Sequence, residues 1–212
     1  MHQRKGKKVL TYFILLLLVG SINNISMNSL KFQKIRDINI IGLGDYDNSI
    51  LLKEIKSLDL DIIFFINSKK IQNQINANTL VETYDIFKRY PSSLDINIKK
   101  TKFLARINNN GKVFLVGSNG KLSKNNFSNN HLPFIFGNPD IKDFLNFKKI
   151  IDQSNFSYDE FKNLYFFSSK RWDIELKNDL IIKLPKNYTI DSLQLIFDFL
   201  DNNDLSYCYL VL

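Results

Sequence analysis

The sequence predicts an α+β protein: an N-terminal transmembrane helix, a β-α-α-β-β unit, and a second half of strands with flanking helices. Three observations predict it. They are a basic N-terminus before an apolar run, apolar residues at helical spacing in 51–58, and strict alternation of apolar and polar residues in 94–99. Without its N-terminal segment, the chain still has room for one large domain or for two of about 100 residues each.

The N-terminus carries clustered cations directly before the apolar run. No acidic residue precedes Asp37. Because clustered cations stay on the cytoplasmic side, we expect residues 1–8 to be a cytoplasmic tail, 9–27 a transmembrane helix, and the rest an exported body. The anchor residues in this interpretation are Arg4, Lys5, Lys7, Lys8, Leu15, Leu16 and Leu17.

The length of the apolar run leaves a second interpretation open. As a helix, Val9 to Ile22 would span about 21 Å, whereas the hydrocarbon layer is roughly 30 Å thick. A cleavable signal peptide has the same outline, and residues 19–21 would be a tolerable cleavage site. Apolar residues resume at Ile25 and Met27, which favours an uncleaved anchor.

Composition argues against several classes of function. The net charge is +8, but four positive charges lie in the first eight residues and no basic stripe follows, so no nucleic-acid role is expected. The two histidines, His2 and His131, cannot assemble a zinc site or a Ser/His/Asp arrangement. We therefore predict a non-enzymatic protein without cofactor or small-molecule substrate. Cys208 is the sole cysteine, so hydrophobic cores, not an internal disulfide, must stabilise the body.

Local patterns place the elements of the first half. Alternation in 37–40 predicts a strand, after which Asp47 or Ser49 can cap a first helix and Asn67 or Ser68 a second one. The apolar faces of these helices are Leu51, Leu52, Ile55 and Leu58 in the first, and Ile71 and Ile75 in the second. The extended segments that follow are 81–90, 93–100 and 105–116, with a hairpin signal at Asn109-Asn110-Gly111.

In the second half, residues 171–177 alternate between two strand faces. The apolar face consists of Trp172, Ile174 and Leu176, and we expect it to pack on a helix through Ile190, Leu193, Ile196, Phe197 and Leu200. The opposite, polar face consists of Arg171, Asp173, Glu175 and Lys177. We expect Trp172 to be a core residue and Arg171 to be solvated or ion-paired.

The first half resembles the POTRA domain of the cell-division family FtsQ, also called DivIB. The matching positions are Val81, Ile86, Arg89, Tyr90-Pro91, Leu94, Ile96, Ile98, Ala105, Leu115-Val116 and Gly120. One departure is that Lys100, Thr101 and Phe103 stand where the family usually has a glutamate-arginine pair and a proline.

The second half resembles the β domain of the same family. Leu132-Pro133 with Gly137 matches its entry, and Arg171 to Pro185 is similar to its arginine-tryptophan-aspartate hairpin. Asp179 replaces the usual turn glycine. The resemblance implies a POTRA domain over 35–103 and a mostly antiparallel β domain over 104–212.

The resemblance also implies the function. It predicts an inner-membrane protein of the division septum, with a periplasmic body, that recruits other division proteins without catalysis. Family partners would be FtsK and FtsW near the POTRA domain, and FtsB and FtsL on the β domain, partly through addition of a partner strand to a sheet edge. The candidate partner-binding residues are Arg89, Tyr90, Pro91, Arg171, Trp172, Asp173, Tyr207, Tyr209 and Val211.

Other interpretations remain open at this point. POTRA domains also serve in protein translocation and outer-membrane assembly, although the repeats or barrel typical of those proteins are not evident in the sequence. A secreted domain would result if the N-terminal segment were cleaved. In the family, a further strand follows the one that matches 207–212, so we expect the chain to be a fragment that continues beyond Leu212.

Overall fold

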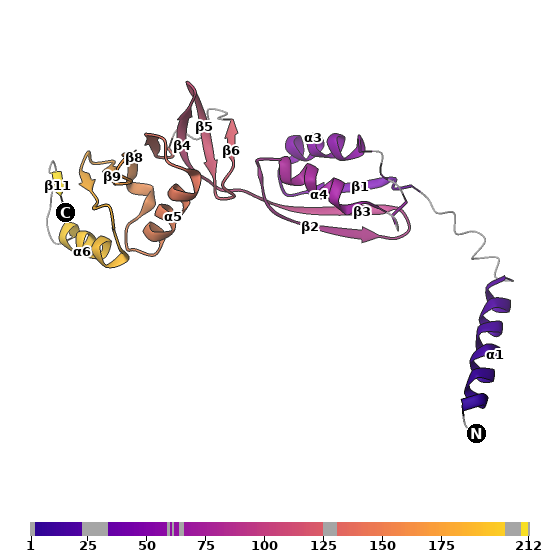
Figure 1. Cartoon of the computed structure of the whole chain (residues 1–212). Coiled ribbons are helices and arrows are strands. Elements are labelled where there is room, and N and C mark those ends of the chain that lie inside the picture. The colour runs from indigo at the N-terminus through magenta and orange to yellow at the C-terminus, as the bar shows by residue number, and fades with distance from the viewer. Residues whose placement is uncertain are drawn as a thin grey trace.

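The structure is a computed structural model, which describes residues 3–22, 34–58, 60, 62–63, 66–124, 131–201 and 209–211. Its helices and strands form two separate sheets with helices packed on them, which confirms the predicted α+β class (Figure 1). In chain order the elements are α1 Gln3–Ile22, β1 Asp37–Ile41, α3 Asp45–Lys56, α4 Ser68–Ala77, β2 Val81–Arg89, β3 Ser93–Lys100, β4 Phe103–Asn109, β5 Lys112–Gly117, β6 Leu122–Lys124, β7 Phe134–Phe136, α5 Ile141–Asp152, the short 3₁₀ helix η1 Tyr158–Glu160, β8 Phe161–Phe166, β9 Trp172–Leu176, β10 Ile181–Lys183, α6 Ile190–Asp201 and β11 Tyr209–Val211.

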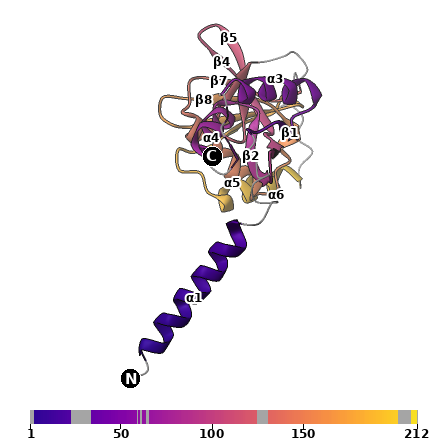
Figure 2. The ribbon, with the colours of Figure 1, turned by 90° about the vertical axis from the view of Figure 1, so that its right-hand side faces the viewer.

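Helix α1 contains the basic cluster and the apolar run, and among the described elements no sheet or other helix packs against it in either view (Figures 1 and 2). Its central leucines Leu15, Leu16 and Leu17 are 50%, 69% and 56% exposed. Residues 23–27 of the predicted transmembrane helix and the side chains of Arg4 and Lys5 lie outside the described part. Among the described residues, we find no helix that combines enough length with enough apolar character to cross a bilayer.

The smaller sheet has the strand order β1-β3-β2, with β1 parallel and β2 antiparallel to the central strand. Helices α3 and α4 cover one face of it. Leu51 and Ile55 from α3 and Ile71 and Ile75 from α4 are almost completely buried against the strands. The strand residues of this core include Ile40, Val81, Leu94, Ile96 and Ile98. The alternation in 94–99 thus arises because one face of β3 is covered and the other is not.

The two helices of the first half begin differently from each other. Asn67 caps α4, because its side-chain oxygen accepts a hydrogen bond from the Lys69 amide at 3.1 Å, as predicted. The predicted cap of α3 is wrong: this helix begins at Asp45, after Gly44, without a side-chain cap. Asp47 lies in its first turn instead, where a carboxylate still favours the positive end of the helix dipole.

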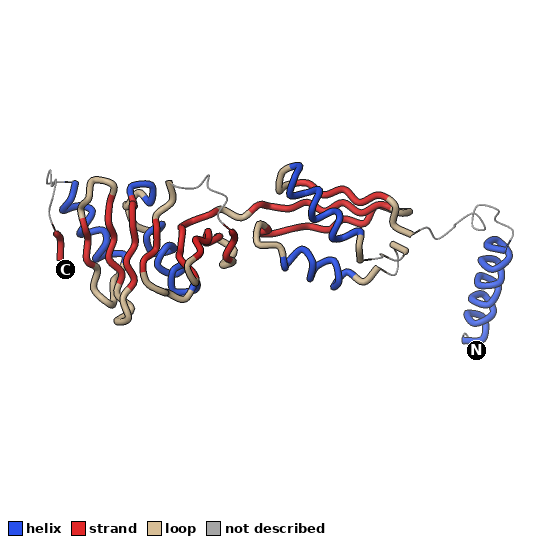
Figure 3. The backbone as a smooth tube through the Cα atoms, turned by 90° about the horizontal axis from the view of Figure 1, so that it is seen from above, coloured by secondary structure: helices blue, strands red, loops and turns tan. Residues whose placement is uncertain are grey.

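The larger sheet has the order β11-β10-β9-β8-β7-β4-β5-β6, and its strands lie side by side in Figure 3. It is mostly antiparallel, as predicted, but it also has three parallel pairs among the described strands: β4 with β7, β7 with β8, and β10 with β11. The cause lies in the connections. Helix α5 joins β7 to β8 and helix α6 lies between β10 and β11, and a helical crossover returns the chain in the same direction.

Trp172 lies at the centre of the larger core, with 1% exposure, which confirms its prediction as a core residue. The ring of Phe147 on α5 stacks on it, with centroids 4.7 Å apart and planes at 15°, and Phe166 lies 4.8 Å away. The sequence predicts that the helix over 190–201 covers this face, which holds only in part. Leu193 and Ile196 of α6 do join the core, but α5 supplies the stacking ring and Ile190 is 41% exposed.

Candidate partner-binding surfaces

Sheet edges are the first candidate surface, because an unpaired strand edge offers main-chain groups to an added strand. Within the described residues, β1 and β2 border the smaller sheet, and β11 and β6 border the larger one. Strand β2, from Val81 to Arg89, is the longest of these edges. It pairs only with β3 in the described part of the chain, so its outer side is open to a partner strand.

The predicted residues Arg89, Tyr90 and Pro91 lie where β2 turns into β3. The Arg89 guanidinium forms an ion pair with Asp95 on the neighbouring strand, but its side chain remains 74% exposed. Tyr90 is 59% exposed and Pro91 is also exposed. The three residues therefore lie together at the C-terminal end of the open edge.

The predicted residues Arg171, Trp172 and Asp173 have three different environments. Trp172 is buried, so it supports the core and does not offer a contact surface. The side chain of Asp173 is only 6% exposed and accepts two hydrogen bonds from Arg171, at 3.0 and 3.2 Å. Arg171 is 39% exposed and lies 4.6 Å from the centroid of the Phe167 ring. The expectation of an ion-paired Arg171 is confirmed, and its partner Asp173 lies on the same polar strand face but is buried.

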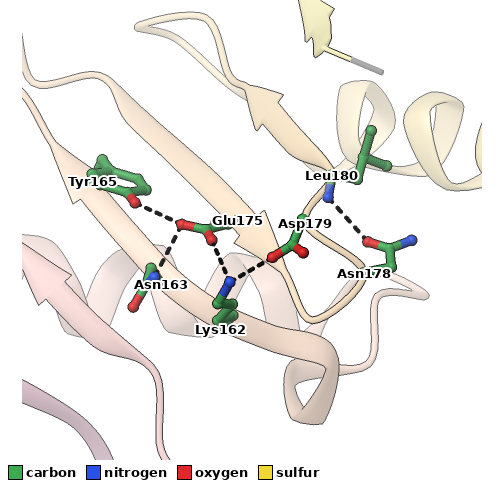
Figure 4. A network of polar contacts seen from close by, with 7 residues as sticks. All are labelled: Lys162, Asn163, Tyr165, Glu175, Asn178, Asp179 and Leu180. Carbon is green, nitrogen blue, oxygen red and sulfur yellow. Dashed lines mark hydrogen bonds and ion pairs between the residues drawn. The ribbon is translucent and has the colours of Figure 1, made fainter. Parts of the chain in front are cut away.

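Glu175 on the same face is also covered, and it lies at the centre of a polar network (Figure 4). Its carboxylate accepts hydrogen bonds from the Tyr165 hydroxyl at 2.6 Å and the Asn163 amide at 3.0 Å, and the Lys162 ammonium lies 3.0 Å from it. Lys162 also pairs with Asp179 across the adjacent strand end. The network ties β8 to β9 and to the turn that leads into β10.

The network shifts the pKa values of its members. Burial alone would raise the pKa of Glu175, but the hydrogen bonds from Tyr165 and Asn163, together with Lys162, more than offset this and hold the pKa below its usual value. The hydrogen bond to Glu175, followed by burial, raises the pKa of the Tyr165 hydroxyl. Hydrogen bonds first to Asp179 and then to Glu175 raise the pKa of Lys162.

We expect Glu175→Gln to lower the free energy of unfolding by about 1–2 kcal/mol at pH 7, because charge-assisted hydrogen bonds are lost. A carboxyl group whose pKa is lower in the folded state stabilises the fold above its ordinary pKa, near 4.5, and loses this effect as the pH falls through the folded-state value. Urea unfolding at pH 7 and pH 3 should therefore show the two proteins converging in acid. An equal difference at both pH values would contradict the assignment.

At the far border of the larger sheet, β11 pairs with β10 in parallel, with Tyr209 opposite Ile181 and Val211 opposite Lys183. The predicted residue Tyr207 lies outside the described residues, as do the side chains of Tyr209 and Val211. The backbone of β11 is a second open strand within the described part.

The uncovered face of the larger sheet carries an aromatic row that sequence analysis did not identify. Phe134 and Phe136 on β7 lie with their ring centroids 4.8 Å apart, and Phe136 stacks on Tyr165 of β8 at 5.0 Å. Arg106 on β4 lies 5.7 Å from the centroid of Phe134. The spacing of two in residues 134–136 was the available signal, because alternate strand residues share a face.

In the part of the chain that the structure describes, no group of three or more His, Cys, Asp or Glu side chains could hold a metal ion. The polar residues near the candidate surfaces are engaged in structural networks between strands. The arrangement is suited to presenting strands and side chains to another macromolecule.

Comparisons with known proteins return cell-division proteins. Residues 33–100 match the family of FtsQ-type POTRA domains. The cell-division protein FtsQ of Rickettsia bellii (strain RML369-C) is 24% identical over 164 residues, which cover 73% of this chain and 59% of that relative's length. The major extracytoplasmic domain of the cell-division protein DivIB from Geobacillus stearothermophilus aligns with a TM-score of 0.34 and 12% identity, over 49% of this chain and 88% of that one.

The matched range coincides with the smaller sheet and its two helices, from β1 through β3. This is the unit in which the sequence already resembled the family at the Arg89-Tyr90-Pro91 turn and in β3. The resemblance is therefore confirmed: residues 33–100 form an FtsQ-type POTRA domain, and the chain is similar to the cell-division protein FtsQ of Rickettsia bellii.

Proposed function

We propose that this protein is a single-pass inner-membrane scaffold of the division septum, with its body in the periplasm, and that it links early and late division proteins without catalysis. The observation that supports this most directly is an FtsQ-type POTRA domain whose long edge strand β2 is open in the described structure. A scaffold needs such surfaces because main-chain hydrogen bonds at an edge can hold a partner strand.

Two partner sites follow from the two sheets. We assign FtsK and FtsW to the POTRA side, where Arg89, Tyr90 and Pro91 lie beside the end of β2. We assign FtsB and FtsL to the β domain, where Tyr207, Tyr209 and Val211 belong to or adjoin the β11 border, and where Arg171 is partly exposed. Trp172 and Asp173 act indirectly, since both are buried and hold Arg171 and its hairpin in place.

The membrane anchor in this proposal is the apolar part of α1 together with the residues that follow it. Its support is the basic cluster at the N-terminal end and the exposure of the apolar side chains from Val9 to Val19, which is 49% to 70% in the helix. Lys and Arg can extend toward the membrane surface while their aliphatic stems stay apolar.

A charge in the middle of α1 should weaken membrane attachment. We expect Leu16→Arg to shift much of the protein from the carbonate-resistant membrane fraction to the soluble fraction, because a cation at a helix centre costs about 2.5–3.5 kcal/mol of insertion free energy. Leu16→Ile, an apolar replacement at the same position, is the matched control and should leave the protein in the membrane fraction. A wild-type protein that is itself extracted by carbonate would contradict an anchor.

Localisation tests the division role. A fluorescent protein fused to the N-terminus, expressed as the sole copy, should form a band at midcell, and depletion of the protein should give undivided filaments. A uniform envelope signal with normal division would contradict the proposal and favour a role in protein translocation or outer-membrane assembly.

A further inference from the structure

A side chain from the larger sheet forms hydrogen bonds with main-chain groups at the N-terminal end of β2. Asn119, in the turn between β5 and β6, donates from its amide nitrogen to the backbone carbonyls of Thr79 at 2.9 Å and Val81 at 2.8 Å. Its amide oxygen accepts from the Lys121 backbone at 3.0 Å. Both N–H groups and the oxygen of this amide are thus used, and the two N–H groups reach main-chain carbonyls at the start of the POTRA edge strand.

The carboxylate of Glu82, on the smaller sheet, accepts a second set of hydrogen bonds beside the contacts of Asn119. Glu82 on β2 accepts from the Thr101 hydroxyl at 2.8 Å and from the Ser118 hydroxyl at 2.7 Å. Thr101 is 5% exposed and lies on the two-residue connection between β3 and β4. Hydrogen bonds to a carboxylate are stronger than neutral ones, so this contact holds the connection against the turn.

A third contact reaches the end of helix α4. The Lys121 ammonium donates to the carbonyls of Asn76 at 2.6 Å and Asn78 at 3.2 Å. A cation at the C-terminal end of a helix satisfies unpaired carbonyls and interacts favourably with the helix dipole. The larger sheet thereby supplies part of the cap of a POTRA helix.

The fit around these contacts is tight. A Cβ atom placed on Gly117 would lie 2.6 Å from Asn119 Oδ1 and 2.9 Å from Thr101 Oγ1. The Ser118 backbone also bonds the Lys102 carbonyl at 2.8 Å. Only a residue without a side chain leaves Asn119 and Thr101 in these positions.

We propose that Glu82, Thr101, Ser118, Asn119 and Lys121 form an interdomain joint that holds the POTRA domain and the β domain in one fixed orientation. Small interfaces between domains of one chain ordinarily permit relative motion, and here directed polar bonds on three elements of the POTRA domain restrict it. The joint also shortens the part of β2 that can pair with a partner strand, because the Val81 carbonyl already accepts a hydrogen bond from Asn119. A strand added to β2 is therefore restricted to Thr83 through Arg89; this second consequence rests on the proposed function, whereas the fixed orientation does not.

The test is a distance measurement by pulsed electron spin resonance on the whole 212-residue chain in detergent. Cys208→Ser removes the native thiol, and spin labels are attached at Lys53→Cys on α3 and Lys149→Cys on α5, both exposed positions. We expect one narrow distance distribution in this background. Asn119→Ala should make the distribution about twofold broader, because relative motion is the default for domains that lack such restraints.

The matched control is Asn109→Ala, an exposed asparagine at the end of β4, which should leave the width unchanged. Glu82→Ala is the second joint variant and should also broaden the distribution, so the test does not depend on the folding of one protein. Far-ultraviolet circular dichroism and Trp172 fluorescence check that each variant is folded.

Two results would contradict the proposed joint. One is a broad distance distribution in the spin-labelled protein without a joint substitution, and the other is an equal width of the distribution for the Asn119→Ala and Asn109→Ala variants. Either result would leave septal localisation untouched, so failure of the joint is distinguishable from failure of the proposed function.

Discussion

Trp172→Ala is expected to lower the free energy of unfolding of the β domain by about 3–5 kcal/mol, the range measured for removal of a buried aromatic side chain. The ring is 1% exposed and contacts aromatic residues from both a strand and a helix. Close packing prevents the surroundings from filling the cavity, and the stacked Phe147 would lose its partner.

Urea unfolding followed by far-ultraviolet circular dichroism measures this effect, because the variant has no tryptophan to report by fluorescence. Leu195→Ala is the control: Leu195 lies on α6 with 66% exposure, so its truncation should change stability by about 0.5 kcal/mol or less. A loss below about 1 kcal/mol for Trp172→Ala would mean that the ring is not packed as described.

Gly42→Ala is expected to destabilise the POTRA domain by about 3 kcal/mol or more, because it combines backbone strain with a steric clash. Gly42 has a φ of 121°, and a Cβ at this position would lie 1.7 Å from the Ile98 carbonyl oxygen. That oxygen belongs to the backbone of β3, so the overlap can be relieved only if the backbone of β3 or of the turn at Gly42 moves.

Gly44→Ala separates the contribution of backbone strain from that of the steric clash. Gly44 also has a positive φ, of 106°, but a Cβ there meets no atom within 4 Å, so we expect a loss of about 1 kcal/mol from strain alone. Circular dichroism again follows the unfolding. If both variants lowered the free energy of unfolding equally, the clash with the Ile98 carbonyl would not contribute to the destabilisation.

Much of the fold could be predicted because its signals are local. Each of these signals depends on residues that are close together in the sequence. Examples are the alternation in β3, the helical spacing of Ile71 and Ile75, and the Asn67 cap. The start of α3 could not be placed in the same way, since Gly44 begins it without a side-chain cap and Asp47 is an equally plausible signal in sequence.

What could not be predicted depends on contacts between distant segments. The choice of α5 over α6 as the partner of Trp172 follows from the parallel crossover between β7 and β8, which has no local signal. Alternation predicts that Asp173 and Glu175 share the polar face of their strand, but it does not predict that Arg171 and side chains of β8 bond to them there.

The interdomain joint was likewise invisible in sequence. Asn119 and Lys121 lie in a polar stretch that suggests an ordinary turn, and their partners are about forty residues earlier in the chain. Polar residues that bond main-chain groups of another domain look the same in sequence as polar residues that face water.

Site-specific photo-crosslinking in dividing cells tests the central claim that open sheet edges hold other division proteins. A photoreactive amino acid is placed at Phe87 on β2, which is 51% exposed, and at the exposed control position Lys149 on α5. The account predicts crosslinks from position 87 to FtsK or FtsW and none from position 149. The absence of any division protein at position 87, or the same products from both positions, would contradict it.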